Sequence, residues 1–571
     1  MHDLVIRNGT VIDGTGAPRR HADVAVDGGR IAAVGEVPGR GRREIDARGL
    51  LVTPGFVDIH THYDGQATWD QDLTPSCWHG VTTAIFGNCG VGFAPVKAGT
   101  TDFLINLMEG VEDIPGTVLD EGVSFDWESF PEYLDALERQ PRTMDVGAQV
   151  PHSALRFYVM GERGASHTET PTAAEMERMG ALLEEALRAG AFGFTTSRTT
   201  KHRARDGRLV PTLTADEPEL FALAQAMRRA GSGVLEVNSD WGPGEFEILR
   251  AAAEVAGRPL SCLLLEYSSD PDRWRQVMAG IHAARAAGVD ASAQVAGRPV
   301  GVIMSLETSI NPFGAHPSWS ELEPLSPPER VRRLREDAGL RARLLSEQSG
   351  NRRMQAMLEK SYLIGDRPDY EPDPRQCLSE LARAEGVSLW EKAMELLLAG
   401  DGRGLLMHPF ENYAHGNLEA VREMLADEAS VISGSDAGAH VSTICDASAP
   451  TTLLTLWGRD RKRGEQLPLE FLVRKQTLGN ALSYGLRDRG ALLPGMRADI
   501  NVIDFEKLRV RKPEIVYDLP AGGRRLIQRA DGYRHTFVAG VETLRDDELT
   551  GERPGGLLRA GRLAEAVPAG G

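Results

Sequence analysis

The stretch FVDIHTH, residues 56–62, decides both the fold of this chain and the place of its chemistry. Its apolar residues, preceded by a Pro-Gly pair, predict a buried β-strand. Because alternate side chains of a strand share a face, Asp58, His60 and His62 point the same way. Two imidazoles at the end of one strand can hold a divalent metal ion. The apolar strand favours this interpretation over two histidines that happen to lie near a loop.

Strand-like and helix-like segments alternate between residues 51 and 485. The strand candidates include GVTTAIFGN (80–88) and GLLMHPF (404–410), and amphipathic helices such as residues 172–190 lie between several of them. Repeated βα units predict an α/β fold with a parallel sheet, and a count near eight favours a closed, TIM-like (β/α)8 barrel over an open sheet. The carboxyl ends of barrel strands form the catalytic face, where the histidine pair would lie.

Both ends of the chain are rich in short strands with glycine turns, for example DLVIRNGTVID (3–13) and HTFVAGVET (535–543). We therefore expect one small, discontinuous β-sandwich domain built from residues 1–50 and from residues 486–571, with a loose tail. Within the barrel, a Pro-rich and polar stretch at about residues 306–375 predicts an insertion. It is either a lid or oligomer contact, or a plain surface excursion.

Composition excludes several classes of partner. The chain has 571 residues and a formal net charge of −18, which disfavours binding to nucleic acid or to an anionic membrane. No apolar stretch approaches the roughly 20 residues that span a bilayer, and MHDLVIRNGT does not resemble a secretion signal. The five cysteines are scattered and odd in number, as expected for cytosolic thiols or a metal ligand. We expect a cytoplasmic protein, for which assembly into a homo-oligomer stays open.

Two further residues with metal-binding chemistry follow predicted strands. Cys89 lies among glycines in FGNCGVG (86–92), where its thiolate could bind zinc at about 2.3 Å or remain a buried thiol. Asp436 follows an apolar strand in VISGSDAGAH (431–440), where it could also cap a helix. The first and last strands of a closed barrel are neighbours, so we expect Asp436 beside the histidine pair.

Several motifs together resemble one protein family. PGFVDIHTH (54–62), GNCGVGFAP (87–95) and SGSDAGAH (433–440) are similar to the amidohydrolase superfamily, and more narrowly to its D-aminoacylase (N-acyl-D-amino-acid deacylase) family. The resemblance is strengthened by LMEGVEDIP (107–115), VPHSALR (150–156), LRDRGALLPGMRADINVIDF (486–505) and DGYRHTFVAGVET (531–543). It covers nearly the whole chain.

The resemblance implies a metal-dependent barrel with a small β-sandwich from both termini. It also implies zinc bound by His60, His62, Cys89 and Asp436, with the cysteine in the bridging role that a carbamylated lysine has elsewhere in the superfamily. The implied reaction is hydrolysis of the linear amide bond of an N-acyl-D-amino acid, so the expected partner is a small-molecule amide substrate.

The chain departs from its relatives at the fifth and sixth strands, which usually add two metal-binding histidines. The corresponding segments, residues 233–241 and 259–270, contain no histidine. They carry instead Glu236, Asn238, Cys262 and Glu266. We therefore expect one zinc ion per chain, held by His60, His62 and Asp436, with Cys89 as the candidate for a fourth ligand.

Amide hydrolysis needs a proton carrier and stabilisation of the developing oxyanion. Asp436 could take the proton from water and pass it to the leaving nitrogen, while His440 and His152 are candidates for the oxyanion or the proton, or else loop histidines with structural hydrogen bonds. An N-acyl amino acid also carries a free carboxylate, which needs a cationic anchor. The candidates are Arg298, Lys201 and Arg203.

Two alternatives remain from the sequence. The same barrel could hydrolyse a cyclic amide or another small amide. A degenerate barrel could also serve as a binding scaffold, its missing histidines marking lost catalysis. The presence of both histidines and the distal aspartate argues against a scaffold, because buried polar ligands have no packing value of their own.

Overall fold

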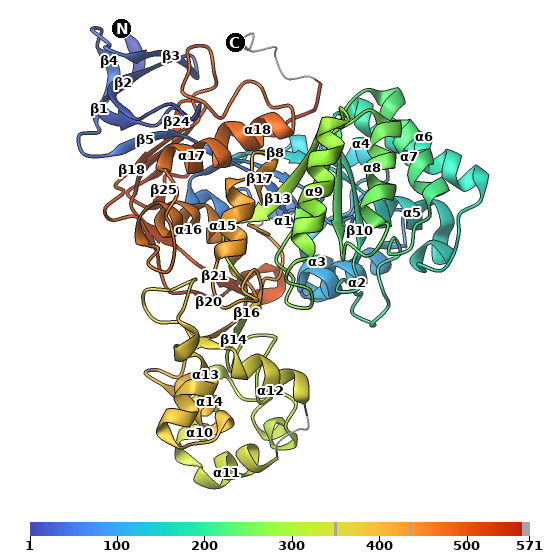
Figure 1. Ribbon diagram of the computed structural model, residues 1–571, viewed down its shortest axis with the longest axis vertical. Helices are drawn as coiled ribbons and strands as arrows, with labels where there is room; N and C mark the ends of the chain where they lie inside the picture. The colour runs from blue at the N-terminus through green and yellow to red at the C-terminus, as the bar shows by residue number, and fades with distance from the viewer. Residues whose placement is uncertain (348–350, 434, 562–571) are drawn as a thin grey trace.

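A six-stranded and a three-stranded parallel sheet lie at the centre of the protein (Figure 1) and together form a ring of strands. The computed structural model describes residues 1–347, 351–433 and 435–561. In chain order the ring consists of β6 (Phe56–Thr61), β7 (Val81–Phe86), β8 (Asp145–Ala148) with β9 (Val150–Pro151), β10 (Gly193–Arg198), β11 (Val234–Ser239), β12 (Leu260–Leu264), β13 (Ala291–Ala296) and β17 (Ser430–Ser433). Neighbours pair in parallel. The ring closes where Thr61 forms a parallel bridge with Ala437, which confirms the predicted (β/α)8 barrel.

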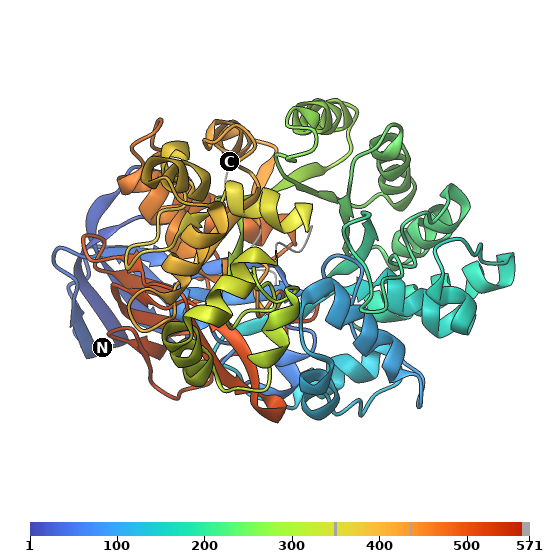
Figure 2. The ribbon, with the colours of Figure 1, turned by 90° about the horizontal axis from the view of Figure 1, so that it is seen from below.

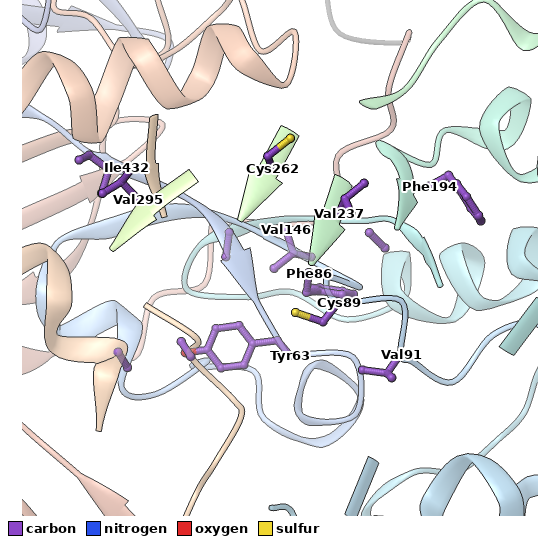
Figure 3. Close-up of a cluster of buried hydrophobic side chains, with 14 of the residues drawn as sticks. Tyr63, Phe86, Cys89, Val91, Val146, Phe194, Val237, Cys262, Val295 and Ile432 are labelled. Carbon is purple, nitrogen blue, oxygen red and sulfur yellow. The ribbon is translucent and has the colours of Figure 1, made fainter. Parts of the chain in front are cut away.

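The barrel strands are buried on both faces. Every residue of β6, β7 and β10 is buried, and β-branched and aromatic residues, which favour strands, recur along them. Figure 3 shows part of the surrounding core, with Phe86 of β7, Val146 of β8 and Val237 of β11 among its side chains. A rigid, fully packed wall of this kind can hold functional side chains at its rim with little freedom.

Helices pack outside the ring, among them α6 (Ala173–Ala189), α7 (Glu217–Ala230), α8 (Glu245–Ala256) and α9 (Arg273–Ala286) (Figure 1). The helix predicted over residues 172–190 is α6. It begins with a capping box, in which the Thr172 side chain accepts the backbone N–H of Glu175 and the Glu175 carboxylate accepts that of Thr172. It ends at Gly190, whose positive φ of 119° suits a residue without a side chain.

One predicted barrel strand lies elsewhere. The GLLMHPF stretch forms β16 (Leu406–Glu411), which pairs antiparallel with β14 (Val300–Met304) and β15 (Tyr362–Leu363) in a separate three-stranded sheet. The expectation that it belongs to the ring was wrong, because a short apolar run does not reveal which sheet it joins.

The insertion is longer than the 306–375 expected from the sequence, since it occupies the chain between β14 and β16. Its helices are α10 (Pro327–Glu336), α11 (Ala338–Ser346), α12 (Arg352–Glu359), α13 (Leu378–Glu385) and α14 (Leu389–Leu398). They surround an apolar cluster of their own, which includes Phe313, Trp319 and Trp390. Figure 1 shows this segment as a separate lobe at the bottom of the view, and in Figure 2, seen from below, it lies in front of the rest of the molecule. A segment with its own core is more than a surface loop.

The two ends of the chain form one β domain. Nine strands share a sheet, in which β5 (Leu51–Pro54) pairs in parallel with β1 (His2–Val11) and antiparallel with β18 (Ile500–Ile503). The N-terminal part therefore reaches Pro54 rather than residue 50. The domain has an apolar cluster separate from the barrel core. Within the described part of the chain, no helix combines the length and apolarity needed to cross a membrane.

A buried cluster of charges joins the barrel to the segment leading into the C-terminal strands. Arg489 is 1% exposed, and its Nη1 donates to Asp145 Oδ2 of β8 at 2.6 Å. Its Nε donates to Asp488 Oδ1 at 2.9 Å, and Asp499 Oδ2 lies 3.9 Å from Nη1. Removing one partner of such a buried group leaves the opposite charges uncompensated.

We predict that Arg489→Met lowers the free energy of unfolding by about 3 kcal/mol, because buried carboxylates lose their partner. Arg497, which also pairs with Asp145, limits the loss. The measurement is the urea midpoint together with the melting temperature. Arg487→Met, at an exposed position two residues away, is the control and should change stability by less than about 0.5 kcal/mol. Equal stability of the two variants would contradict the structural role of Arg489.

Candidate metal centre

Three potential metal ligands converge at the carboxyl end of the first two barrel strands. His60 lies on β6, His62 follows it, and Cys89 lies on the turn after β7. One ligand atom from each lies within 4.8 Å of the others, and Cys89 Sγ is 3.4 Å from His60 Nε2. All three are at most 4% exposed. Cys89 has a φ of 55°, which is strained for a residue with a side chain and is typical of functional sites.

Asp436 reaches the same point from the other end of the chain. Closure of the ring between β17 and β6 places its Oδ1 at 3.5 Å from His60 Nε2 and 3.3 Å from His62 Nε2. Its side chain is 26% exposed, so it forms the outer edge of the cluster. Asp436 also has a positive φ, 46°. The structure thus brings together all four residues that the sequence predicted as metal ligands.

The far nitrogens of both histidines face acceptor oxygens. His60 Nδ1 lies 2.7 Å from Gln294 Oε1, an acceptor, so Nδ1 carries the proton and Nε2 presents its lone pair to the cluster. His62 Nδ1 lies 3.3 Å from Glu112 Oε1. An outer hydrogen bond of this kind orients a metal-binding imidazole.

Burial perturbs the acidic groups around the cluster. It raises the pKa of the Asp58 carboxyl to about 6, that of Glu236 to about 7, and that of Glu112 well above its usual range. Burial, with neighbouring carboxylates, also holds the pKa of the Cys89 thiol well above its usual range. Burial opposes ionisation of Asp436, but its hydrogen bond to His62 and the nearby imidazoles lower its pKa overall.

The donor set fits a bound zinc ion. Two imidazoles, a thiol and a carboxylate are the ligand types that zinc prefers. Several buried polar atoms at the site also lack a hydrogen-bond partner among the described residues, namely Asp58 Oδ2, His62 Nδ1, Glu112 Oε1 and Glu236 Oε1. Such atoms are expensive to bury, and a divalent cation would compensate the negative ones.

The fifth strand, β11, supplies hydrogen bonds to the cysteine. Glu236 Oε2 accepts the backbone N–H of Cys89 at 3.1 Å, and Asn238 Nδ2 donates to Cys89 Sγ at 3.5 Å. Asn238 Nδ2 also lies 3.3 Å from His202 Nε2, and Ser197 Oγ holds His202 Nδ1 at 2.9 Å. Burial and neighbouring imidazoles lower the pKa of His202 to about 3, so this ring is neutral.

Sequence reasoning missed His202. It selected the cations on either side, Lys201 and Arg203, in the SRTTKHR stretch after β10. The available signal was a histidine just beyond a barrel strand. Glu112 lies in the LMEGVEDIP motif, for which the sequence suggests no chemical role, and nothing in the sequence singles out Gln294.

The two candidate catalytic histidines differ in placement. His440 lies at the site, with Nε2 3.8 Å from Asp436 Oδ2, and its side chain is 25% exposed. His152 is fully buried and has both ring nitrogens engaged, one with Thr196 Oγ1 at 2.9 Å and the other with Glu219 Oε1 at 3.1 Å. These bonds are those of a structural histidine, the alternative that the sequence left open.

The candidate cations are also engaged. Arg298 is 2% exposed, its Nη2 donates to Asp446 Oδ1 at 2.6 Å, and its guanidinium lies 4.1 Å from the Tyr370 ring centroid. Its charged head is therefore paired inside the protein rather than free to anchor a substrate carboxylate, as the sequence had suggested. Lys201 Nζ lies 2.5 Å from Glu411 Oε1, and its side chain is 36% exposed. Arg203 is exposed on the same loop. Burial of Arg298 follows from its charged partner, which sequence spacing did not reveal.

The barrel carries a histidine pair at the end of its first strand and an aspartate after its last strand. This arrangement is typical of metal-binding barrels with hydrolytic chemistry. The family model for the amidohydrolase family matches residues 43–543, and the chain belongs to this family. The resemblance inferred from the sequence motifs is thereby confirmed.

Two named relatives show which members of the family this chain is similar to. A D-aminoacylase of Alcaligenes xylosoxydans xylosoxydans is 39% identical over 34% of this chain and 37% of its own length. An N-acyl-D-glutamate deacylase of the same organism is 28% identical over 99% of this chain and 98% of its length. The match to D-aminoacylase therefore spans little more than a third of that relative.

Two solved structures have a similar fold over nearly the whole length of this chain. A D-aminoacylase structure, described in terms of a binuclear metal centre with one-metal activation and second-metal attenuation, has a TM-score of 0.65 and 26% identity. N-acyl-D-glutamate deacylase of Bordetella bronchiseptica, complexed with zinc and a phosphonate inhibitor, has a TM-score of 0.65 and 25% identity. Each covers 98% of this chain and is itself matched over its full length.

We predict that zinc affinity rises with pH through Cys89. Burial raises the pKa of this thiol, so near pH 7 zinc must displace its proton, and affinity should rise about tenfold per pH unit. Zinc affinity should rise with pH as long as the pH is below the pKa of the thiol, because above that pKa the proton is already lost. Chelator competition between pH 6 and 8 measures the slope. Cys89→Ser should weaken zinc binding. It should also lower the slope of log affinity against pH by about one, because one proton fewer is displaced.

The matched control for this measurement is Cys377→Ser, in the insertion lobe, which should keep the wild-type affinity and slope. An unchanged slope in Cys89→Ser would rule out the thiol as a ligand.

Proposed function

We propose that this protein is a hydrolase with one zinc ion per chain that cleaves the amide bond of N-acyl-D-amino acids, releasing a carboxylic acid and a free D-amino acid. The observation that carries the proposal is the convergence of His60, His62, Cys89 and Asp436 at the mouth of an amidohydrolase-family barrel. The names of the similar proteins support the substrate class and the D configuration, since nothing in the described side chains reads chirality by itself.

The chain's own groups suit the proposed reaction. Zinc, when bound, supplies a Lewis acid that polarises a carbonyl and lowers the pKa of water towards about 7. Asp436 has a lowered pKa and is therefore ionised, so its carboxylate can take a proton from the attacking water and return it to the leaving nitrogen. His440 Nε2, 3.8 Å from Asp436 Oδ2 at the open edge, is placed to donate to the developing oxyanion.

Lys201 is the preferred anchor for the substrate carboxylate. It lies one residue before His202, which faces the cluster, and its side chain is 36% exposed. Its present partner, Glu411, would exchange for the substrate carboxylate. Arg203 lies on the same loop and could assist, whereas Arg298 would first have to break its buried pair with Asp446.

We propose a single zinc ion because protein groups already occupy the space beside Cys89. Asn238 donates to Cys89 Sγ from the strand on which the family resemblance implied a histidine. The solved D-aminoacylase is described as activated by one metal. We also propose a cytoplasmic location, supported by five free cysteines.

We predict that metal analysis finds about one zinc ion per chain and that free amine is released preferentially from N-acyl-D-amino acids. The panel includes N-acyl-L-amino acids and cyclic amides, assayed by amine or carboxylic acid release. Turnover confined to cyclic amides would replace the proposed substrate, and a protein without metal under zinc-replete conditions would favour a binding scaffold.

His60→Ala should abolish zinc binding and turnover, because it removes a proposed zinc ligand. Asp436→Asn should lower kcat by about a hundredfold or more, because it removes the proposed proton carrier. Circular dichroism checks that both variants stay folded. His282→Ala, on the exposed face of α9 and bonded to Asp427, is the control and should keep full activity. Activity retained by His60→Ala would remove the metal mechanism.

A further inference from the structure

Glu112 lies directly behind the histidine pair. It is the last residue of α2 (Thr101–Glu112), it belongs to the LMEGVEDIP motif, and its side chain is 2% exposed. Its Oε1 lies 3.3 Å from His62 Nδ1, and within the described residues neither atom has a hydrogen-bond partner. Two orphaned buried polar atoms that face each other at this distance can satisfy one another with a small rotation.

We propose that Glu112 is the positioning residue of the metal site. Its carboxyl oxygen accepts the Nδ1–H of His62 and so selects the tautomer whose Nε2 lone pair is free for a metal ion, in place of the tautomer whose Nε2–H donates to Asp436. The inference rests on the proposed function only in that it assumes a metal ion at this cluster. The ring geometry agrees, because His62 Nε2 lies 3.3 Å from Asp436 Oδ1 while Nδ1 faces Glu112 on the opposite side.

The neighbouring histidine shows the same arrangement in completed form. His60 Nδ1 already donates to Gln294 Oε1 at 2.7 Å. Each imidazole of the pair therefore has one outer acceptor, an amide oxygen for His60 and a carboxyl oxygen for His62. Losing such a partner typically weakens metal binding by 10–100-fold.

The end of α2 also holds the loop that carries Asp436. The backbone carbonyl of Glu112 accepts the N–H of His440, and Glu112 Oε2 lies 3.8 Å from His440 Nε2. Asp113 Oδ2 accepts the Thr443 hydroxyl at 3.0 Å. His440 has a φ of 49°, a strained conformation that persists only when surrounding contacts hold it. Glu112 therefore links a ligand on the first strand to the loop after the last strand.

The experiment measures zinc affinity by chelator competition and records the absorption spectrum of the cobalt(II)-substituted protein. Glu112→Leu removes the acceptor while keeping the bulk, and should weaken zinc binding by about 10–100-fold and alter the cobalt spectrum. Glu112→Gln retains an acceptor oxygen and should lie closer to wild type than Glu112→Leu in both measurements.

The control is Glu109→Leu, one turn earlier on the same helix, where the carboxylate pairs with Arg205 at the surface. It should leave affinity and spectrum unchanged. Glu112→Met is the second variant if Glu112→Leu does not fold, and it has the same expected outcome. Wild-type affinity and spectrum in Glu112→Leu or Glu112→Met would overturn the inference.

These measurements contain no substrate. A wild-type protein that binds zinc but leaves N-acyl-D-amino acids intact would overturn the proposed substrate and leave the role of Glu112 standing. Unchanged zinc binding in the Glu112 variants would do the reverse.

Discussion

Closure of the barrel between β17 and β6 is the constraint on which the rest of the structure depends. The parallel bridge from Thr61 to Ala437 places the loop after the last strand against the end of the first. As a result Asp436, more than 370 residues along the chain from His62, lies within 3.5 Å of both histidine Nε2 atoms. Without this contact the histidine pair would lack its carboxylate, and no constellation for amide chemistry would exist.

The electrostatics of the site follow from where these groups are buried. Three buried carboxyl groups lie near the candidate ligands, those of Asp58, Glu112 and Glu236. Burial raises the pKa of each. Buried carboxyl oxygens without hydrogen-bond partners in the described chain favour a cation nearby. These outer groups, like the four candidate ligands, therefore suit a divalent ion.

The end of β11 carries Asn238, at the strand for which the family resemblance implied a histidine. Asn238 donates to the cysteine sulfur and contacts His202, and His202 is in turn held by Ser197. A chain of neutral polar groups thus occupies the side of the cysteine that faces β11.

Local patterns predicted the barrel, the β domain from both termini and four candidate metal ligands, which the structure brings together. Strand periodicity predicts which side chains share a face, and closure of a barrel makes its first and last strands neighbours whatever their separation. His60, His62, Cys89 and Asp436 could therefore be named from local patterns.

The partners of these residues follow from how distant segments of the chain pack together. The assignments of β16, His152 and Arg298 depended on which sheet or which opposite charge each would meet, and short patterns carry no information about such contacts. Glu112 and His202 come from a helix end and a loop whose packing alone brings them to the metal cluster. Their roles arise from distances between segments far apart in the chain, and that is why they escape a reading of the sequence.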